Sequence, residues 1–330
     1  MDEGARFPRV AAKAGHYESF YIKACEPGGG RGIWIRHTVH KRPGAEPNAS
    51  IWFVLFDRAA EGPRATKVTV PASELSAPLG SWVQVGDATI GPGRAEGSVD
   101  TDALAAAWSL NFIAEAEPCR YLPADWLYEA PLPKTKFVAP VPLAHFEGRL
   151  EIDGGESLEL SGWPGMIGHN WGSEHAERWV WLEGTGFGDA PDTYFDAGAA
   201  RVRLGSRSSP WIPSGMLMLE GEPHRLGGLG AIRSASIEES PSACSFVLPG
   251  KDVLVRGRVA APTKDFVGWV YADPKGPEHN TVNCSVADLE LTVEQPGLPA
   301  RHLTLDGGAA YELGMRESDH GVPIQPYPDG

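Results

Sequence analysis

The side chains best suited to chemistry gather at the middle of the chain, between positions 168 and 183, in the sequence G-H-N-W-G-S-E-H-A-E-R-W-V-W-L-E. This stretch holds two of the ten histidines, three of the eleven tryptophans and three glutamates. Histidine and glutamate are common general acids and bases, and indole rings bind apolar molecules and cations. We therefore expect this stretch to contribute to a functional site.

The stretch reads as a short strand, a polar loop and a second strand. Because side chains alternate between the two faces of a strand, His169 and Trp171 share one face of the first strand. By the same rule, Trp179, Trp181 and Glu183 share one face of the second strand. The sequence thus predicts two rows of aromatic and ionisable side chains that are joined by the polar loop.

The histidines and cysteines form no recognisable metal site. A zinc site could be assembled from His169, Glu174 and His175, but their spacing fits no familiar set of zinc ligands, and we expect no metal. The cysteines lie far apart and form no C-x-x-C pair, at Cys25, Cys119, Cys244 and Cys284. We expect buried thiols in a reducing compartment, which argues against a disulfide framework.

The composition is that of an ordinary globular protein, and 330 residues are enough for two domains. The formal net charge of -14 argues against nucleic acid as a partner and against electrostatic docking on an anionic membrane. The first ten residues contain acidic side chains and no apolar run, and no segment reaches the length of a membrane span. We therefore expect a cytoplasmic protein without a signal peptide or a stable membrane span.

Short strands dominate the expected secondary structure. The 40 glycines and 29 prolines favour frequent turns over long helices. Apolar runs between turn residues predict strands, in the first half of the chain over 17–24, 33–40, 51–56 and 108–114. Residues 118–142 contain six prolines and predict an irregular crossing segment, whereas 101–107 predict a short helix. Together these segments predict an all-β fold.

A repeated pattern indicates an internal duplication. Alternating apolar residues surround an Asp-Gly-Gly sequence that begins at Asp153, and the same pattern recurs 153 residues later at Asp306. The same offset relates Gly15-His16 to Gly168-His169. We therefore predict two β-rich units in tandem, residues 1–165 and residues 166–330, each ending on a hairpin.

The offset also compares the two copies residue by residue. His16 and Glu18 are the counterparts of His169 and Trp171, so that a glutamate stands in the first copy where the second has a tryptophan. This difference predicts that the first copy lacks the functional pattern of the second.

The chain resembles, at this central stretch, the lipocalin-like two-domain family of carotenoid 1,2-hydratases, tocopherol cyclases and AttH-like proteins, whose fold some natural-product Diels–Alderases share. The H-N-W-G and W-x-W segments of that family are present as His169-Asn170-Trp171-Gly172 and Trp179-Val180-Trp181. The Y-x-D of its hydratases is present as Tyr194-Phe195-Asp196. The resemblance implies two lipocalin-like antiparallel β-barrels or half-barrels in tandem, with a ligand pocket at their interface or in a barrel mouth.

The resemblance further implies chemistry on a hydrophobic, often isoprenoid, substrate without a metal or an organic cofactor. An acid protonates an alkene, and water or a phenol oxygen captures the resulting carbocation. In this chain the acid–base pair would be His169 with Asp196, beside Trp171 and Tyr194. A buried carboxyl group has a raised pKa and can stay protonated near neutral pH, and an aromatic face stabilises a cation.

Other residues near the motif are expected to bind the substrate, namely Asn170, Glu174, Trp179, Trp181 and Glu183. Each assignment has a structural alternative. The indole rings can simply fill a barrel, His169 can cap its strand through a hydrogen bond to the backbone, and Asp196 can be buried with a partner or face outward. His279, in a polar turn, is a further pocket candidate.

These patterns favour a cofactor-independent lyase or isomerase, of hydratase or cyclase type, that acts on an alkene-bearing isoprenoid or polyketide by acid–base catalysis in an apolar pocket. Two alternatives stay open. A carrier protein for a lipid or pigment would use the same barrels without a functional acid. A pericyclase of the Diels–Alderase type would need only a shaped pocket with one or two hydrogen-bond donors.

Overall fold

The structure is a computed structural model that describes residues 4–328, and most of these residues lie in antiparallel strands. The helical segments within these residues are single 3-10 turns: η1 (Phe7–Arg9), η2 (Ala72–Glu74), η3 (Asp125–Tyr128), η4 (Leu229–Ala231) and η5 (Thr263–Asp265). None of the helices in this part of the chain is long and apolar enough to cross a membrane. The all-β prediction is confirmed.

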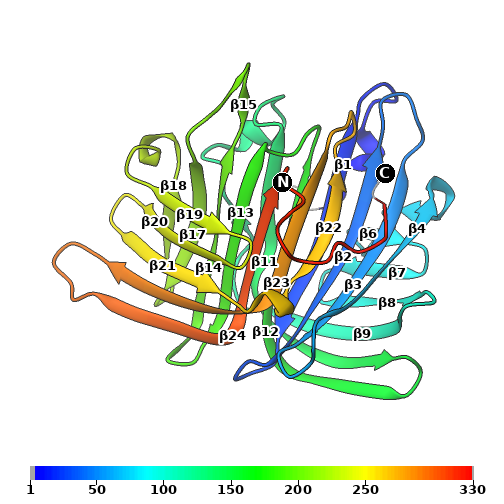
Figure 1. Cartoon of the computed structure of the whole chain (residues 1–330), viewed down its shortest axis with the longest axis horizontal. Helices are drawn as coiled ribbons and strands as arrows, with labels where there is room; N and C mark the ends of the chain where they lie inside the picture. Colours follow the sequence, from blue (N-terminus) through cyan, green and yellow to red (C-terminus); the bar gives the residue numbers. More distant parts are fainter. Residues whose placement is uncertain (1–3, 329–330) are drawn as a thin grey trace.

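The first curled sheet, blue to green in Figure 1, is formed by the N-terminal half of the chain. Its strand order is β4-β3-β2-β1-β12-β11-β9-β8-β7-β6-β5, and β10 pairs with β11. The strands are β1 (His16–Cys25), β2 (Arg31–Lys41), β3 (Asn48–Asp57), β4 (Arg64–Pro71), β5 (Leu75–Ser76), β6 (Val83–Val85), β7 (Ala88–Gly91), β8 (Arg94–Asp100), β9 (Ala105–Ala114), β10 (Cys119–Arg120), β11 (Thr135–Ile152) and β12 (Glu156–Gly172).

The second curled sheet lies beside the first and is formed by the C-terminal half (Figure 1). Its order is β18-β17-β14-β13-β24-β23-β21-β20-β19, and β22 pairs with β23. The strands are β13 (Arg178–Phe187), β14 (Ala190–Arg201), β17 (Ile212–Leu219), β18 (Glu222–Gly227), β19 (Ser236–Ser240), β20 (Ala243–Pro249), β21 (Leu254–Ala260), β22 (Val267–Ala272), β23 (Glu278–Glu294) and β24 (Arg301–Met315). A separate hairpin joins β15 (Arg203–Leu204) to β16 (Arg207–Ser208).

The two strand orders confirm the predicted duplication. The centre β1-β12-β11 of the first sheet corresponds to β13-β24-β23 of the second. On one side β2, β3 and β4 correspond to β14, β17 and β18, and on the other side β9, β8 and β7 correspond to β21, β20 and β19. Even the short β10, which pairs with β11, has a counterpart in β22, which pairs with β23. The chain passes from one sheet to the other at residues 173–177, whereas the predicted boundary between the two units lies after residue 165.

The offset of 153 residues is wrong as a residue-by-residue alignment. Asp153 lies in the tight turn between β11 and β12, with a positive φ. Asp306 instead lies inside β24, where residues 306–308 form a bulge opposite β23, because Leu305 pairs with Leu289 and Ala309 with Ala287. Asp-Gly-Gly suits both a turn and a bulge, so only the pairing of neighbouring strands separates the two.

The short helix predicted over residues 101–107 is also wrong. Residues 101–104 form a turn in which the side-chain oxygen of Thr101 accepts hydrogen bonds from the backbone of Ala103 and Leu104. Ala105 then opens β9 by pairing with Asp100. The threonine side chain offers the backbone a local alternative to helical hydrogen bonds. The segment 118–142 is irregular as predicted only until β11 begins at Thr135.

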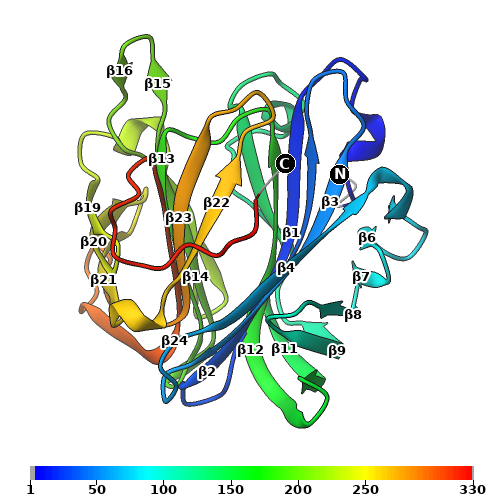
Figure 2. The same cartoon turned by 45° about the vertical axis from the view of Figure 1, so that its right-hand side comes forward.

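Strand β1 separates two different environments, because both of its faces are buried. One face carries His16, Glu18, Phe20 and Ile22, and the last two belong to the core inside the first sheet. On the other face, Tyr21 contacts Trp181 and Lys23 contacts Glu183, both of the second sheet, which lies beside β1 in Figure 2. The strand predicted over 17–24 is therefore confirmed, and an ionisable side chain on it can reach either the first barrel or the interface.

The interface between the sheets has an apolar part and a polar part. Trp52 of the first sheet packs edge-on against Trp269 of the second, with ring centroids 4.8 Å apart. Farther along, the buried Lys23 forms an ion pair with the buried Glu183, at 2.7 Å between Nζ and Oε2. The four cysteines are buried and form no disulfide among the described residues. The interface therefore combines aromatic packing with a buried ion pair.

Candidate functional site

The predicted motif forms the end of β12, the loop 173–177 and the beginning of β13. β12 pairs with β1 on one side and β11 on the other, so its two faces are those of the first sheet. Ile167 belongs to the core inside the first sheet, and its neighbour Met166 belongs to the cluster between the sheets. His169 and Trp171 lie two and four residues beyond Ile167 and share its face. The predicted alternation places them inside the first barrel.

His169 is held by Glu18, which sequence reasoning had assigned only to the inactive first copy. Nε2 of His169 donates to Oε1 of Glu18 at 2.8 Å, and Nε2 of His16 donates to Oε2 at 3.1 Å. The backbone amides of Arg6 and Phe7 donate to the same carboxylate at 2.6 and 2.7 Å. The two histidines that the 153-residue offset treated as counterparts therefore share one carboxylate, which the adjacent strands β1 and β12 of the first sheet bring between them.

We call this network the Glu18 cluster, and the side chains of Glu18, His16 and His169 are buried in it. Burial by itself would raise the pKa of Glu18, but the hydrogen bonds from His16 and His169 outweigh it and lower the pKa to about 2. The ring of His169 stacks on Phe20 at 3.8 Å and lies 4.6 Å from the ring of Trp171. Burial lowers the pKa of His169 more than Glu18 raises it. The arrangement pairs a permanent carboxylate with a neutral imidazole.

Asp196 belongs to a different group of residues, on the opposite face of the first sheet. Its Oδ2 accepts a hydrogen bond from the hydroxyl of Tyr121, and its Oδ1 accepts one from Nε1 of Trp181 at 2.9 Å. Trp181 packs edge-on against Tyr21 of β1, with ring centroids 5.3 Å apart. We call these four residues, together with the adjoining Tyr194, the Asp196 cluster. It lies between the sheets and draws on both of them.

The carboxyl group of Asp196 stays protonated to an unusually high pH. Burial raises its pKa to about 7, against the smaller opposing effects of the hydrogen bonds from Tyr121 and Trp181, and the charge of Glu183 acts in the same direction as burial. The side chains of Tyr21, Tyr194 and Cys119 also surround it, and each of them has a raised pKa because it is buried. A carboxylic acid that is about half protonated at neutral pH can both give and take a proton.

The structure does not bring together the predicted pair of His169 and Asp196. His169 on β12 faces the inside of the first sheet, whereas Asp196 on β14 of the second sheet lies on the other side of it. Tyr194, which the resemblance placed beside the pair, lies on the same face of β14 as Asp196, and Trp181, expected among the substrate-binding residues, donates to Asp196. Trp171 stays with His169. The expected set is thus divided between two clusters.

The remaining predicted residues lie along the interface. Nε1 of Trp179 donates to Glu312 at 2.9 Å, and Glu183 pairs with Lys23. Asn170 lies on the interface face of β12, where it pairs with Ser19 of β1. Glu174 is paired with Lys134 at the partly exposed edge of the interface. All of these residues have structural partners or positions that do not by themselves indicate substrate binding.

Sequence reasoning missed the phenol that bonds to Asp196. Tyr121 lies in the proline-rich segment between β10 and η3, where no periodicity marks a buried residue. Its side chain is nevertheless only 6% exposed, because this segment crosses over the interface and packs with Tyr194, Met166 and Met216. The role of Tyr121 becomes visible only from its hydrogen bond to Asp196 of the second sheet.

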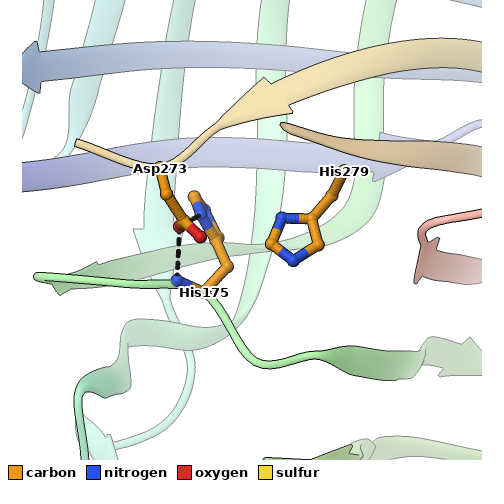
Figure 3. Close-up of side chains that lie close together, drawn as sticks. All are labelled: His175, Asp273 and His279. Atoms are coloured by element: carbon orange, nitrogen blue, oxygen red, sulfur yellow. Dashed lines mark hydrogen bonds and ion pairs between the residues drawn. The ribbon is translucent and has the colours of Figure 1, made fainter. Parts of the chain in front are cut away.

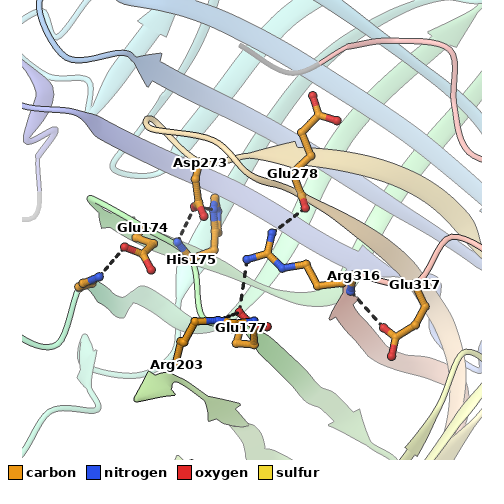
Figure 4. Close-up of polar contacts among 9 residues, drawn as sticks. Glu174, His175, Glu177, Arg203, Asp273, Glu278, Arg316 and Glu317 are labelled. Carbon is orange, nitrogen blue, oxygen red and sulfur yellow. Dashed lines mark hydrogen bonds and ion pairs between the residues drawn. The ribbon is translucent and has the colours of Figure 1, made fainter. Parts of the chain in front are cut away.

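The loop 173–177 ties the two sheets together, as Figure 4 shows. Glu174 accepts a hydrogen bond from Lys134 next to β11, in the first sheet. His175 reaches Asp273 at the end of β22, and Glu177 is paired with Arg203. The loop is therefore anchored on each side by polar contacts. His175, Asp273 and His279 also lie close enough together to hold a metal ion.

A cavity of about 470 Å³ lies at the edge of the first barrel. Its walls are mostly apolar and include Trp82, Phe112 and Val141, with Glu115 and Glu117 as acidic members. Ala116 lines this cavity and also packs against the residues around Tyr121 and Tyr194. The cavity thus borders, at Ala116, the residues around Tyr121 and Tyr194, and it has the size of a small-molecule site.

Comparison with known proteins places this fold among several solved structures. The chain is similar to an AttH-like protein from Nitrosomonas europaea, with a TM-score of 0.55, 14% identity and coverage of 96% of this chain and 98% of that one. It is similar to kievitone hydratase from Nectria haematococca (TM-score 0.51, 9% identity, 92% and 89% coverage) and to CghA, solved with Sch210972 (TM-score 0.54, 11% identity, 92% and 89% coverage). At these identities the likeness shows the two-domain, lipocalin-like fold alone.

Sequence comparison gives relatives whose function is not described. Over 325 residues the chain is 26% identical to an uncharacterized protein found in two strains of Mycobacterium tuberculosis, with 94% of this chain and 90% of that protein covered. No family model matches the chain.

Proposed function

We propose that this protein is a cofactor-independent lyase or isomerase, of hydratase or cyclase type, in which Asp196 protonates an alkene of a largely apolar substrate. The observation that carries the proposal is the Asp196 cluster, a buried carboxyl group with a pKa of about 7 between aromatic side chains. The fold shared with kievitone hydratase and CghA supports this class of activity by analogy.

The proposed reaction uses the groups of the cluster in order. The proton of Asp196 passes to an alkene carbon, and the π electrons form the new C–H bond, which leaves a carbocation on the substrate. The hydroxyl of Tyr121 and the indole N–H of Trp181 stabilise the resulting carboxylate. The faces of Tyr21 and Trp181 stabilise the cation. Water, or an oxygen of the substrate itself, then bonds to the cation and returns a proton to Asp196.

The neighbouring cavity supports an apolar substrate. Its volume of about 470 Å³ suits a molecule of terpenoid or polyketide size, and its walls are mostly apolar. Ala116 lines the cavity and also packs against the residues around Tyr121 and Tyr194, so the proposal places the reacting alkene at this border of the cavity. The isoprenoid class of substrate is part of this proposal and rests on the resemblance described from the sequence.

The experiment that tests the proposal measures proton transfer directly. The purified protein is incubated in D₂O with a panel of isoprenoids that carry terminal isopropylidene groups and with prenylated phenols, and mass spectrometry follows deuterium incorporation, hydration and cyclisation. Asp196→Asn should lower turnover by a factor of about 10² to 10⁴. Turnover by the natural protein should fall as the pH rises above about 7, because Asp196 then loses its proton.

A matched variant distinguishes the loss of the proposed acid from the loss of any carboxylate on the same strand. Asp192 lies exposed on the same strand, and Asp192→Asn should leave turnover unchanged. If Asp196→Asn is as active as the natural protein while Trp181→Phe is inactive, the acid mechanism is wrong and a pericyclic reaction in a shaped pocket becomes the better explanation.

The cavity also favours a second candidate function, a non-catalytic binding protein for a lipid or pigment. Its lining residues carry carboxyl groups at Glu115 and Glu117, but the proposed acid Asp196 is not one of them. A carrier would retain an apolar molecule through purification and would bind it equally well with Asp196→Asn. Native mass spectrometry of the purified protein, followed by extraction with organic solvent, distinguishes a retained cargo from a substrate that turns over.

A further inference from the structure

Three side chains from three separate segments converge at the edge of the interface, away from Asp196. His175 lies in the loop between β12 and β13, Asp273 follows β22, and His279 lies at the start of β23 (Figure 3). One ligand atom of each residue lies within 4.8 Å of the corresponding atoms of the other two. Figure 3 shows the ring of His279 facing His175 and Asp273. We call these three residues the His175 group.

Two members of the group, His175 and Asp273, are hydrogen-bonded to each other. Nδ1 of His175 lies 2.7 Å from Oδ1 of Asp273, and the backbone amide of His175 donates to the same oxygen at 2.6 Å. This double contact fixes the loop against the end of β22. It leaves Oδ2 of Asp273 buried and without a hydrogen-bond partner among residues 4–328.

His279 presents buried polar atoms with no partner. Its side chain has no exposed surface, and neither ring nitrogen has a hydrogen-bond partner within the described part of the chain. A buried polar group that is left unpaired costs about 1–3 kcal/mol, so such groups normally have a partner. One ligand atom of His279 lies within 4.8 Å of one of Asp273 and one of His175, and this convergence of buried atoms without partners indicates that something else binds there.

Aromatic rings hold the histidines in place. The ring of Tyr17 stacks on His175 with centroids 3.9 Å apart and an interplanar angle of 17°. Trp179 lies 5.6 Å from the ring of His175 and 5.2 Å from the ring of His279. Packing on the rings fixes their orientation without using their nitrogens. The side chain of His175 is 11% exposed, so the group can be reached from solvent.

We propose that His175, Asp273 and His279 form a binding site for a divalent cation of the zinc type. Two imidazole nitrogens and one carboxylate oxygen are a ligand set suited to zinc and its neighbours in the first transition row, whereas magnesium and calcium prefer oxygen ligands alone. Three protein ligands leave a fourth position for water or for an oxygen of a bound molecule. Binding would draw the ligand atoms to roughly 3.3 Å from one another, as tetrahedral bonds of about 2.0–2.1 Å require.

The spacing of these residues in the sequence could not suggest this site. The zinc set considered there combined His175 with His169 and Glu174, but the structure places His169 inside the first barrel and Glu174 on Lys134. Asp273 and His279 come from a hairpin about a hundred positions farther along the chain, and only the docking of the second sheet on the first brings them to His175. The site is independent of the Asp196 mechanism.

The test is a zinc titration of the full chain. Protein that has been dialysed against EDTA and then freed of it is titrated with Zn²⁺ by isothermal calorimetry, and its thermal unfolding is followed with and without one equivalent of the ion. We expect one high-affinity site per chain and a higher unfolding temperature in zinc, because the ion binds the folded state. His279→Gln and Asp273→Asn should each weaken binding by about 100-fold or more, since both remove a direct ligand.

His37→Gln is the matched control. His37 is also a buried histidine whose ring nitrogens have no partner among the residues described, but it lies in the first sheet outside the group. This variant and Asp196→Asn should bind zinc like the natural protein, even if the activity proposed for Asp196 is absent. Circular dichroism checks that each variant is folded.

Cobalt provides a second measurement that needs no variant. Co²⁺ added to the natural protein should give the intense visible absorption of a four-coordinate nitrogen and oxygen site. Failure of the natural protein to bind zinc, or equal binding by folded His279→Gln, overturns the proposal, and so does a cobalt spectrum no stronger than that of the aqueous ion. In each of these cases the His175 group is a hydrogen-bonded clamp between the sheets.

Discussion

The Glu18 cluster and the Asp196 cluster lie on opposite faces of the first sheet, and both place a buried carboxyl group among aromatic rings. They differ in the donors that reach the carboxyl group. Glu18 receives two imidazole N–H groups and two backbone amides, and its pKa is lowered to about 2. Asp196 receives one phenol and one indole, and burial raises its pKa to about 7.

The difference shows that burial alone does not set the charge of a carboxyl group. Both groups lose the solvation of water, which disfavours the charged form. Four donors, two of them imidazole N–H groups and two of them backbone amides, replace that solvation at Glu18. Two neutral donors replace it only partly at Asp196, where the nearby Glu183 also opposes ionisation. The first cluster is therefore built to hold a charge, and the second to hold a proton.

The largest expected effect is the pH dependence of stability at Asp196. Its pKa is raised from 3.8 to about 7 in the folded protein, so folding becomes less favourable as the pH rises between these values. Asp196→Asn does not titrate, and its free energy of unfolding should gain about 4 kcal/mol on that of the natural protein between pH 4 and pH 8. Urea unfolding at a series of pH values measures the difference. The exposed Asp192→Asn should show no such gain. If the difference in unfolding free energy between Asp196→Asn and the natural protein stays constant from pH 4 to pH 8, the carboxyl group of Asp196 is charged throughout this range in the natural protein.

The pH dependence of stability expected at Glu18 has the opposite sign to that at Asp196. The pKa of Glu18 is lowered from 4.5 to about 2, so its contribution to stability is complete above pH 4.5 and is lost as the pH falls toward 2. Glu18→Gln should lower the free energy of unfolding by about 3 kcal/mol at pH 7, and the loss should shrink on acidification. The same urea experiments measure it, with the exposed Glu46→Gln as control. A loss that stays constant from pH 7 down to pH 3 would contradict the assignment of Glu18 as the buried charge.

A smaller effect is expected when one donor to Glu18 is removed. His169→Gln takes away the imidazole N–H that reaches Oε1 and the ring that stacks on Phe20, and it should cost about 2 kcal/mol of stability. The variant should also raise the pKa of Glu18, so that acid unfolding begins at a higher pH. Acid titration followed by tryptophan fluorescence tests this result. An unchanged acid transition would show that the backbone amides of Arg6 and Phe7 suffice to hold the charge.

The smallest expected effect concerns the phenol at Asp196. Tyr121→Phe removes one neutral donor to the carboxylate, so the pKa of Asp196 should rise by about one further unit, which corresponds to about 1.4 kcal/mol. Infrared difference spectra of the protonated carboxyl band, recorded against Asp196→Asn, give the midpoint of the titration. A midpoint that moves downward instead would mean that the phenol stabilises the protonated form.

The sequence by itself determined the fold class and the local alternation of side chains. Turn residues and short apolar runs gave the strands, and the period of two placed His169 with Trp171 and Trp179 with Trp181 on shared faces. These features depend on neighbouring residues only. The duplication was also visible, but its register was not, because Asp-Gly-Gly serves as a turn at Asp153 and as a bulge at Asp306.

Only the tertiary structure decided which chemical groups meet. Alternation states that two residues share a face, but it does not state what covers that face. The pairing of β1 with β12 brought Glu18 to His169, and the docking of the two sheets brought Tyr121 to Asp196 and Asp273 to His175. These partners are far apart in the sequence, and their protonation depends on burial and on the donors that the partner supplies. The motif located the central strand of the site, and the packing of the sheets determined its chemistry.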